Sequence, residues 1–184
     1  MKFVSPRNDI AFKKIFGSEQ HSEVLISFLN AVLDLTGERA IVAIEILDPY
    51  QAPKIEDLKS TLVDVKARDK RGISFIVEMQ VERISGYQKR FLYYTAKEYV
   101  EQVERGQHYP QMNQVLFIGI LDFNAFDGDA YLTRHRIMNS ETYQQELTGL
   151  EFTFIELPKF TTPADQLETM LEKWVYFVKQ AEKL

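Results

Sequence analysis

The chain has 184 residues, of which 45% are hydrophobic and 27% are charged. This length and composition are typical of one folded domain and exclude a disordered or fibrous protein. The 22 Lys and Arg against 27 Asp and Glu give a net charge of -5, which argues against nucleic-acid binding through overall positive charge but leaves local basic faces open. The absence of Cys excludes disulfides and thiolate metal sites.

The first residues of the sequence lack the apolar core of a signal peptide. No stretch of the sequence has the length and apolar composition of a transmembrane helix. We therefore predict a cytoplasmic protein that does not enter the membrane.

Four elements are predicted in the first third of the chain. A helix over 8–17 begins at an Asn-Asp pair that can cap it and ends at a glycine. A second helix over 22–35 shows apolar residues at helical spacing. Residues 40–47 are rich in β-branched side chains and predict a strand, and the prolines within 48–58 predict a loop.

The rest of the chain alternates between strand and helix patterns. A hairpin is predicted over 62–81. The elements predicted after it are a helix over 87–105 closed by Gly106, an apolar central strand over 114–121, strands over 131–137 and 151–157, and a helix over 164–183.

The hairpin carries polar side chains where a buried strand should have none. Because side chains alternate across a strand, Asp64 and Lys66 share one face of the first strand, and Glu78 and Gln80 share one face of the second. The opposite faces are apolar, with Val63, Val65 and Ala67 on the first strand. One face of the hairpin therefore belongs to the core, and the other collects the polar groups.

The loop at the tip of the hairpin decides whether these polar groups meet. A three-residue loop over 70–72, with glycine in the left-handed position, is a common hairpin connection. Counting inward from that loop places Asp64 directly opposite Glu78, and Leu62 opposite Gln80. A two-residue loop would put the two acids on opposite faces.

Two carboxylates in directly opposite positions destabilise a hairpin unless a positive charge lies between them. Lys66 lies on the same face, but a hard divalent cation suits the pair better, because Mg²⁺ commonly binds through one or two carboxylates plus substrate phosphate. The alternative is that the four polar side chains are the solvated face of an amphipathic strand pair. Leu62 and Ile76 share that face, which favours the floor of a cleft.

Asp64, followed one strand later by Glu78-Met79-Gln80, resembles the PD-(D/E)XK nuclease signature, in which an Asp and an (Asp/Glu)-x-Lys on neighbouring strands hold a catalytic metal. The order of elements is also similar to the core of that superfamily. The chain is identified as a member of the recombination-promoting nuclease branch, also labelled PD-(D/E)XK family transposases. The segments that carry the resemblance are NDIAFKKIFG (8–17), SFLNAVL (27–33), VDVKARDKRGISFIVEMQV (63–81), KRFLYYTAKEY (89–99), GQHY (106–109) and FIELPKF (154–160).

The resemblance implies an α/β fold with a mixed sheet flanked by helices, a restriction-endonuclease-like core, and a single nuclease-like domain over 1–184. Proteins of this branch often continue into a longer C-terminal region, so the chain is either a short member or a fragment. The implied activity is a metal-dependent endodeoxyribonuclease that cuts DNA in recombination, mobile elements or defence, with Mg²⁺ as cofactor and Mn²⁺ as a substitute. Double-strand cutting by a single-site enzyme commonly needs two subunits, which makes a homodimer a candidate assembly.

Carried over to this sequence, the resemblance makes Asp64 and Glu78 metal ligands, with the backbone carbonyl of Met79 as a third. Gln80 stands where the superfamily usually has Lys, as in variants of this branch. Gln cannot act as a base near neutral pH, but its amide can orient a water that the metal has acidified. Lys66 is a candidate to supply the missing cation.

On the helix after the hairpin, Arg90 and Tyr94 lie four residues apart and share a face. As functional residues they would contact the scissile phosphate or order the ligands. As structural residues, Tyr94 would pack in the core and Arg90 would pair with a surface acid. We favour function for Arg90 and packing for Tyr94. Asp9 and Lys13 share a face of the first helix, where the superfamily sometimes supplies an extra acidic group, but we assign them no role.

The net charge and Gln80 also fit proteins of other classes. One is a catalytically weak or inactive nuclease-fold module that binds DNA or protein, which need not bind Mg²⁺ or Mn²⁺. Another is a purely structural domain, in which Asp64 and Glu78 would face bulk water. Metal binding separates the nuclease from both.

Overall fold

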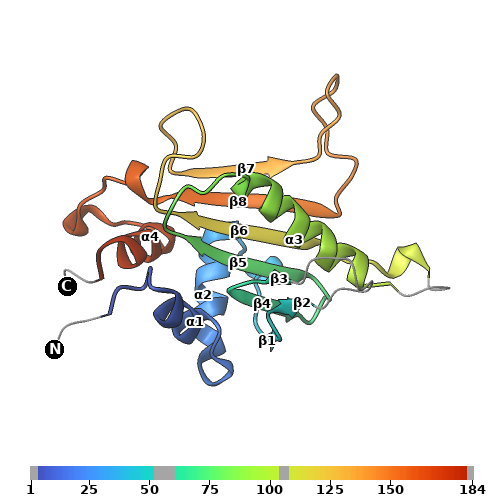
Figure 1. Ribbon diagram of the computed structural model, residues 1–184, viewed down its shortest axis with the longest axis horizontal. Helices are drawn as coiled ribbons and strands as arrows, with labels where there is room; N and C mark the ends of the chain where they lie inside the picture. Colours follow the sequence, from blue (N-terminus) through green and yellow to red (C-terminus); the bar gives the residue numbers. More distant parts are fainter. Residues whose placement is uncertain (1–3, 52–60, 104–107, 182–184) are drawn as a thin grey trace.

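The computed structural model describes residues 4–51, 61–103 and 108–181 of the chain. Its helices flank a mixed sheet (Figure 1), which confirms the predicted α/β class. The elements are, in chain order, α1 (Asp9–Phe16), α2 (Ser22–Leu33), β1 (Ile44–Leu47), β2 (Tyr50–Gln51), β3 (Thr61–Leu62), β4 (Val65–Asp69), β5 (Ser74–Gln80), α3 (Tyr87–Glu101), β6 (Val115–Leu121), β7 (Leu132–Arg136), β8 (Leu150–Glu156) and α4 (Met170–Gln180).

The larger sheet has six strands in the order β1-β4-β5-β6-β8-β7. Strands β5, β6 and β8 run parallel to one another, and the strands outside them are antiparallel to their neighbours. The apolar strand β6 lies between β5 and β8 and contributes side chains to the cores on both faces. The prediction of a central strand covered on both faces is therefore confirmed.

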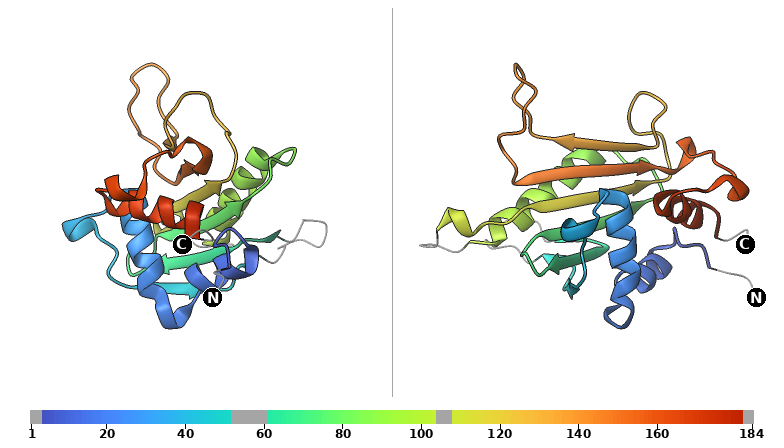
Figure 2. Two further views of the ribbon diagram at one scale, coloured as in Figure 1. Left: turned by 90° about the vertical axis from the view of Figure 1, so that its left-hand side faces the viewer. Right: turned by 180° about the vertical axis from the view of Figure 1, so that it is seen from behind.

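Helices cover the two faces of this sheet (Figure 2). On one face lie α1, α2 and α4, where Phe16 and Phe28 pack in the same core as Val77 of β5. On the other face lies α3, where Phe91 packs against Phe117 of β6, with 4.8 Å between the ring centroids. Lys66 of β4 points to the same side, where it meets Glu98 of α3, and Ile76 of β5 packs in the core of Phe91.

The two N-terminal helices form where the sequence predicts them. The side chain of Asn8 caps α1 by accepting hydrogen bonds from the backbone N–H groups of Ile10 and Ala11. Helix α2 ends at Leu33, two residues earlier than predicted, because Asp34 adopts a left-handed conformation with φ of 54°. Both predictions are confirmed apart from that end.

The first strand is shorter than the predicted range of 40–47 and begins at Ile44. The reason is Asn30 of α2, whose side-chain amide donates to the carbonyl of Ile41 at 2.9 Å and accepts from its N–H at 2.8 Å. Because both backbone groups of Ile41 are occupied by that amide, they do not join a ladder. The chain therefore joins the sheet only at Ile44, three residues after Ile41.

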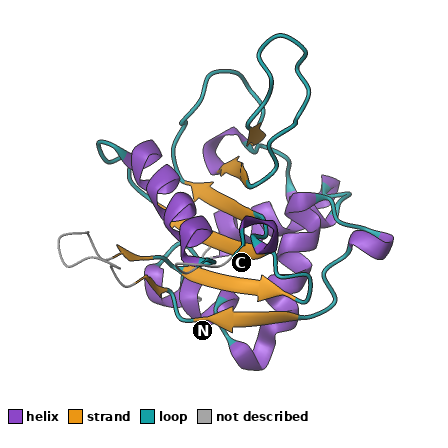
Figure 3. Cartoon of the chain, turned by 90° about the vertical axis from the view of Figure 1, so that its right-hand side faces the viewer, coloured by secondary structure: helices purple, strands orange, loops and turns teal. Residues whose placement is uncertain are grey.

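The short strands β2 and β3 were not predictable from the sequence pattern. They pair only with each other, and Figure 3 shows them beside the larger sheet. Strand β2 lies within 48–58, which was predicted as a loop, and the remainder of that range from residue 52 lies outside the described residues. The β2–β3 pairing draws the chain away from β5 just before β4 begins.

The helix predicted over 87–105 is α3, which is described as far as Glu101. Its predicted closing residue, Gly106, lies outside the described residues. Among the helices of the described part of the chain, none combines the length and apolar composition needed to cross a membrane.

The C-terminal helix is shorter than its predicted range of 164–183. It begins at Met170 because Thr169 caps it, accepting from the N–H of Glu172 while the Glu172 carboxylate accepts from the N–H of Thr169. Residues 182–183 lie outside the described residues. The two preceding strands, β7 and β8, agree with their predicted ranges to within one residue at each end.

The tip of the β4–β5 hairpin is the predicted three-residue loop over 70–72. The N–H of Asp69 donates to the carbonyl of Ile73 at 3.1 Å, which closes the loop. Gly72 has φ of 83°, the left-handed conformation that this loop requires.

Replacing Gly72 by Ala should destabilise the protein by about 1–3 kcal/mol, because an L side chain is strained at this φ. A Cβ at this position would also lie 2.5 Å from Nδ2 of Asn113. Gly128 has φ of 86° with open space around it, so the Gly128→Ala variant isolates the strain from the clash. Urea denaturation should show a larger loss for Gly72→Ala; equal losses would mean that Asn113 moves aside without cost.

Candidate active site

The candidate site lies where the β4–β5 ladder ends. The last pair of residues in that ladder is Val65 with Val77, and the same register places Asp64 opposite Glu78. The register predicted from the three-residue loop is therefore confirmed. Beyond this point the described residues give β5 no backbone partner on its β4 side, so side chains can take that place.

The chain leaves the sheet on the N-terminal side of Asp64. Leu62 pairs with β2, so the prediction that it lies opposite Gln80 is wrong. Val63 was predicted to share a face with Val65, but it packs on the α3 side of the sheet. Both differences have one cause, because side chains alternate regularly only while the strand continues.

Two reciprocal hydrogen bonds fix the acid pair. The backbone N–H of Asp64 donates to Oε1 of Glu78 at 3.1 Å. The backbone N–H of Met79 donates to Oδ2 of Asp64 at 2.8 Å. Each carboxylate thus accepts from the backbone of the other segment, replacing the ladder bonds that β4 no longer provides. The two acids are held against each other.

The acid pair is buried rather than solvated. Glu78 is 5% exposed, and the Asp64 side chain is 14% exposed. Burial and then the charge of Asp64 raise the pKa of Glu78 to about 8, although the Asp64 N–H and the charge of Arg90 work against this. Burial also raises the pKa of Asp64. The alternatives of a solvated face and of acids in bulk water are therefore wrong.

Helix α1 brings a cation to this pair, Lys13, to which the sequence pattern assigns no role. The Lys13 ammonium lies 2.8 Å from Oδ1 of Asp9 and 3.5 Å from Oδ1 of Asp64. Burial works to lower the pKa of Lys13, but the hydrogen bond to Asp9 and the charges of both acids outweigh it and raise that pKa. The spacing of Asp9 and Lys13 placed them on one helix face, but which face reaches the hairpin depends on tertiary packing.

Helix α3 supplies a second cation. The Arg90 guanidinium donates through Nη2 to Oε1 of Gln80, and Nε2 of Gln80 donates to the backbone carbonyl of Glu82 at 2.8 Å. Both ends of the Gln80 amide are therefore engaged. In this arrangement Gln80 holds Arg90, and orienting a water would require the amide to give up one of these bonds.

Arg90 and Tyr94 lie next to each other on one face of α3, as their spacing predicted. The guanidinium carbon of Arg90 lies 5.8 Å from the centre of the Tyr94 ring. Burial raises the pKa of the Tyr94 hydroxyl, and the charge of Arg90 opposes that rise. The Nε–H of Arg90 is buried and has no acceptor among the described residues. This donor is one that a ligand could satisfy.

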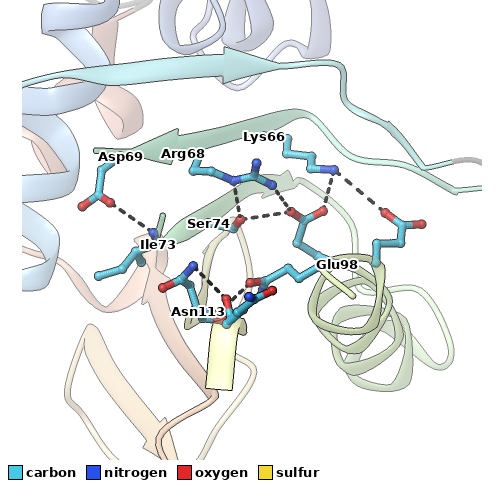
Figure 4. Close-up of polar contacts among 10 residues, drawn as sticks. Lys66, Arg68, Asp69, Ile73, Ser74, Glu98 and Asn113 are labelled. Carbon is cyan, nitrogen blue, oxygen red and sulfur yellow. Dashed lines mark hydrogen bonds and ion pairs between the residues drawn. The ribbon is translucent and has the colours of Figure 1, made fainter. Parts of the chain in front are cut away.

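Lys66 is directed elsewhere. Its ammonium lies 2.5 Å from Oε2 of Glu98 and 4.0 Å from Oε2 of Glu101, both on α3. Figure 4 shows Lys66 and Arg68 of β4 pointing toward Glu98, which also accepts from the Ser74 hydroxyl at 3.0 Å. Lys66 therefore forms an ion pair with Glu98. This geometry does not support Lys66 as the cation of the acid pair.

The donors at the acid pair suit a hard divalent cation. Asp64 and Glu78 offer carboxylate oxygens, and Met79 offers a carbonyl. In a strand the N–H and C=O of one residue point to the same side, so the Met79 carbonyl lies on the edge where its N–H meets Asp64. No group of three or more His, Cys, Asp or Glu side chains in the described ranges is arranged to hold a metal. A bound Mg²⁺ would need water and phosphate as its other ligands.

A mixed sheet flanked by helices, with a buried Asp-Glu pair on its hairpin, defines a protein of the PD-(D/E)XK nuclease class with a restriction-endonuclease-like fold. The chain belongs to the PD-(D/E)XK nuclease family transposases, whose family model matches residues 6–184. No curated protein and no solved structure matches it. Membership of this family supports a nuclease-type function and implies DNA as the substrate.

Proposed function

We propose that this protein is a metal-dependent endodeoxyribonuclease that hydrolyses DNA phosphodiester bonds. The observation that carries the proposal is the buried pair of Asp64 and Glu78, whose pKa values are both raised. Two acids held together away from water favour a divalent cation between them. Nucleases of this superfamily generally use divalent metals. We propose Mg²⁺, with Mn²⁺ as a substitute.

In this proposal Asp64 and Glu78 hold the metal together with the carbonyl of Met79. The bound metal would polarise the scissile phosphate and lower the pKa of a bound water. Arg90 would bring its charge to the phosphate, where a preorganised cation stabilises the charge that develops in the transition state. Gln80 fixes the orientation of Arg90, and Tyr94 packs against the guanidinium.

The biological setting stays a prediction. A transposase family is consistent with DNA cutting in recombination, mobile elements or defence. A single domain over 1–184, a homodimer that cuts both strands and a cytoplasmic location also stay predictions.

The Asp64→Asn variant should lose metal-dependent cleavage by at least about a hundredfold, because it removes a ligand charge and leaves the fold intact. Calorimetry with Mg²⁺ and Mn²⁺ measures binding, and nicking of supercoiled plasmid on the same samples measures cleavage. Asp127→Asn, which changes an exposed acid in the β6–β7 loop, is the matched control and should behave like the wild type. Equal cleavage by Asp64→Asn and the wild type would remove Asp64 from the site.

One observation favours a second candidate, a nuclease-fold module that binds DNA or protein without efficient catalysis. Gln80 replaces the usual lysine, and both ends of its amide are already engaged. Such a module need not bind divalent metals. A folded wild type that shows neither metal binding in the calorimeter nor metal-dependent nicking would favour this candidate over the nuclease.

A further inference from the structure

The nuclease signature has a lysine beside the two acids, but neither Gln80 nor Lys66 puts an ammonium there. Gln80 stands at the signature position and carries no charge. Lys66 lies on the expected face, but Glu98 holds its ammonium at 2.5 Å. A cation for the acid pair must therefore come from outside the β4–β5 hairpin.

Helix α1 is built to deliver such a cation. Phe12 and Phe16, four residues apart, are fully buried and anchor the helix in the core. Asp9 and Lys13, also four apart, lie toward the acid pair. The helix ends at Gly17, where a Cβ would lie 2.7 Å from the carbonyl oxygen of Lys13. The buried side chains anchor the helix in the core, and the hydrogen bond from the Gly17 N–H to the Lys13 carbonyl, at 2.8 Å, closes its last turn.

The Lys13 ammonium is held at the rim of the acid pair rather than inside it. Its closer partner is Asp9, at 2.8 Å, and Asp64 lies farther away, at 3.5 Å. The Lys13 side chain is 33% exposed, whereas that of Asp64 is 14% exposed. A phosphate that approaches the acid pair from solvent would therefore meet an ammonium already positioned by Asp9. Arg90, on α3, is a second cation near the pair, because its charge also acts on Glu78.

We propose that Lys13 is the catalytic cation of this site and contacts the scissile phosphate, in the role that the signature gives to a lysine at position 80. This rests on the proposed nuclease function. Asp9 acts as a positioning residue, because it holds the Lys13 ammonium beside Asp64. The competing explanation is that Lys13 only neutralises the acid pair while no metal is bound.

The test compares Lys13→Met, Lys13→Arg and Lys14→Met with the wild type. Lys14 is the adjacent, exposed lysine of the same helix, so Lys14→Met is the matched control. Single-turnover cleavage of DNA at saturating Mn²⁺ measures the chemical step, calorimetry measures the Mn²⁺ dissociation constant, and thermal unfolding checks the fold. Lys13→Met should cleave about 10²–10³-fold more slowly while binding Mn²⁺ at least as tightly as the wild type. Lys13→Arg, which keeps the charge, should recover part of the rate, and Lys14→Met should be unchanged.

Three results would overturn the role of Lys13. They are equal cleavage rates for Lys13→Met and the wild type, an equal loss in Lys14→Met, and a Lys13→Met variant whose rate falls only because it no longer binds Mn²⁺. If Lys13→Met does not fold, the folded Lys13→Arg decides, and a rate as low as that of Asp64→Asn overturns the proposal. A wild type that does not cleave DNA with any metal counts against the nuclease function itself, which is a separate outcome.

Discussion

The Glu78→Gln variant should be more stable than the wild type at pH 8 to 9 in the absence of metal, by on the order of 4 kcal/mol. Burial and the nearby charge of Asp64 raise the pKa of Glu78 from 4.5 to about 8. A pKa difference of one between the folded and unfolded states corresponds to about 1.4 kcal/mol. Gln has the same shape, can still accept from the Asp64 N–H, and carries no charge.

The pH dependence of this gain has a definite sign. Below pH 4.5 Glu78 is protonated in both the folded and the unfolded protein, so its titration contributes nothing. Between 4.5 and about 8 the unfolded chain loses the proton while the folded protein keeps it, so the wild type loses stability as the pH rises. The difference between Glu78→Gln and the wild type should therefore grow across this window and level off above it.

Urea denaturation at several pH values from 4.5 to 9, in the presence of a chelator, measures this difference. Glu141→Gln, at an exposed position far along the chain, is the control and should follow the wild type at every pH. A difference between Glu78→Gln and the wild type that stays constant over the whole range would show that Glu78 is not held protonated. Saturating Mg²⁺ should stabilise the wild type more than Glu78→Gln, because only the wild type gains a compensated charge.

The Lys66→Met variant should lose about 3 kcal/mol of stability, a cost typical of removing one partner from a buried ion pair. Glu98 is 1% exposed, and its nearest cation is the Lys66 ammonium at 2.5 Å. Without Lys66, the Glu98 carboxylate keeps the Ser74 hydroxyl and a guanidinium nitrogen of Arg68 at 3.6 Å. These contacts place the expected loss at the low end of the range for such pairs.

Chemical denaturation of a double-mutant cycle checks this expectation. The Lys66→Met/Glu98→Leu double variant should recover most of the loss, because it leaves no unpaired buried charge. Lys70→Met, at the exposed tip of the same hairpin, should change stability by less than about 0.5 kcal/mol. A loss in the double variant as large as the sum of the two single losses would show that Lys66 and Glu98 are not coupled.

The fold was predictable where the sequence pattern is local. The helix start at the Asn8-Asp9 pair, the apolar run of β6 and the loop over 70–72 each follow from residues close together in the chain, and each is confirmed. The start of β1 was not predictable in this way. It depends on the side chain of Asn30, which forms hydrogen bonds with both backbone groups of Ile41. The spacing of hydrophobic residues gives no sign of such bonds.

The candidate site was predictable to the same extent. The meeting of Asp64 and Glu78 followed from the register of one hairpin. The partner of Lys66 and the approach of Lys13 did not, because both depend on how α3 and α1 pack across the sheet. The sequence placed Lys66 on the correct face, but only the position of Glu98 on α3 decides where its ammonium points.

The position of Lys13 on α1 bears on the order in which the parts of the site form during folding. Lys13 and Asp64 are about fifty residues apart in the chain, and contacts between distant segments form late because their loop must close first. The hairpin that carries both acids can form locally, before α1 docks through Phe12 and Phe16. Under the role proposed for Lys13, the hairpin alone does not complete the site, and the lysine joins the two acids only once α1 has docked.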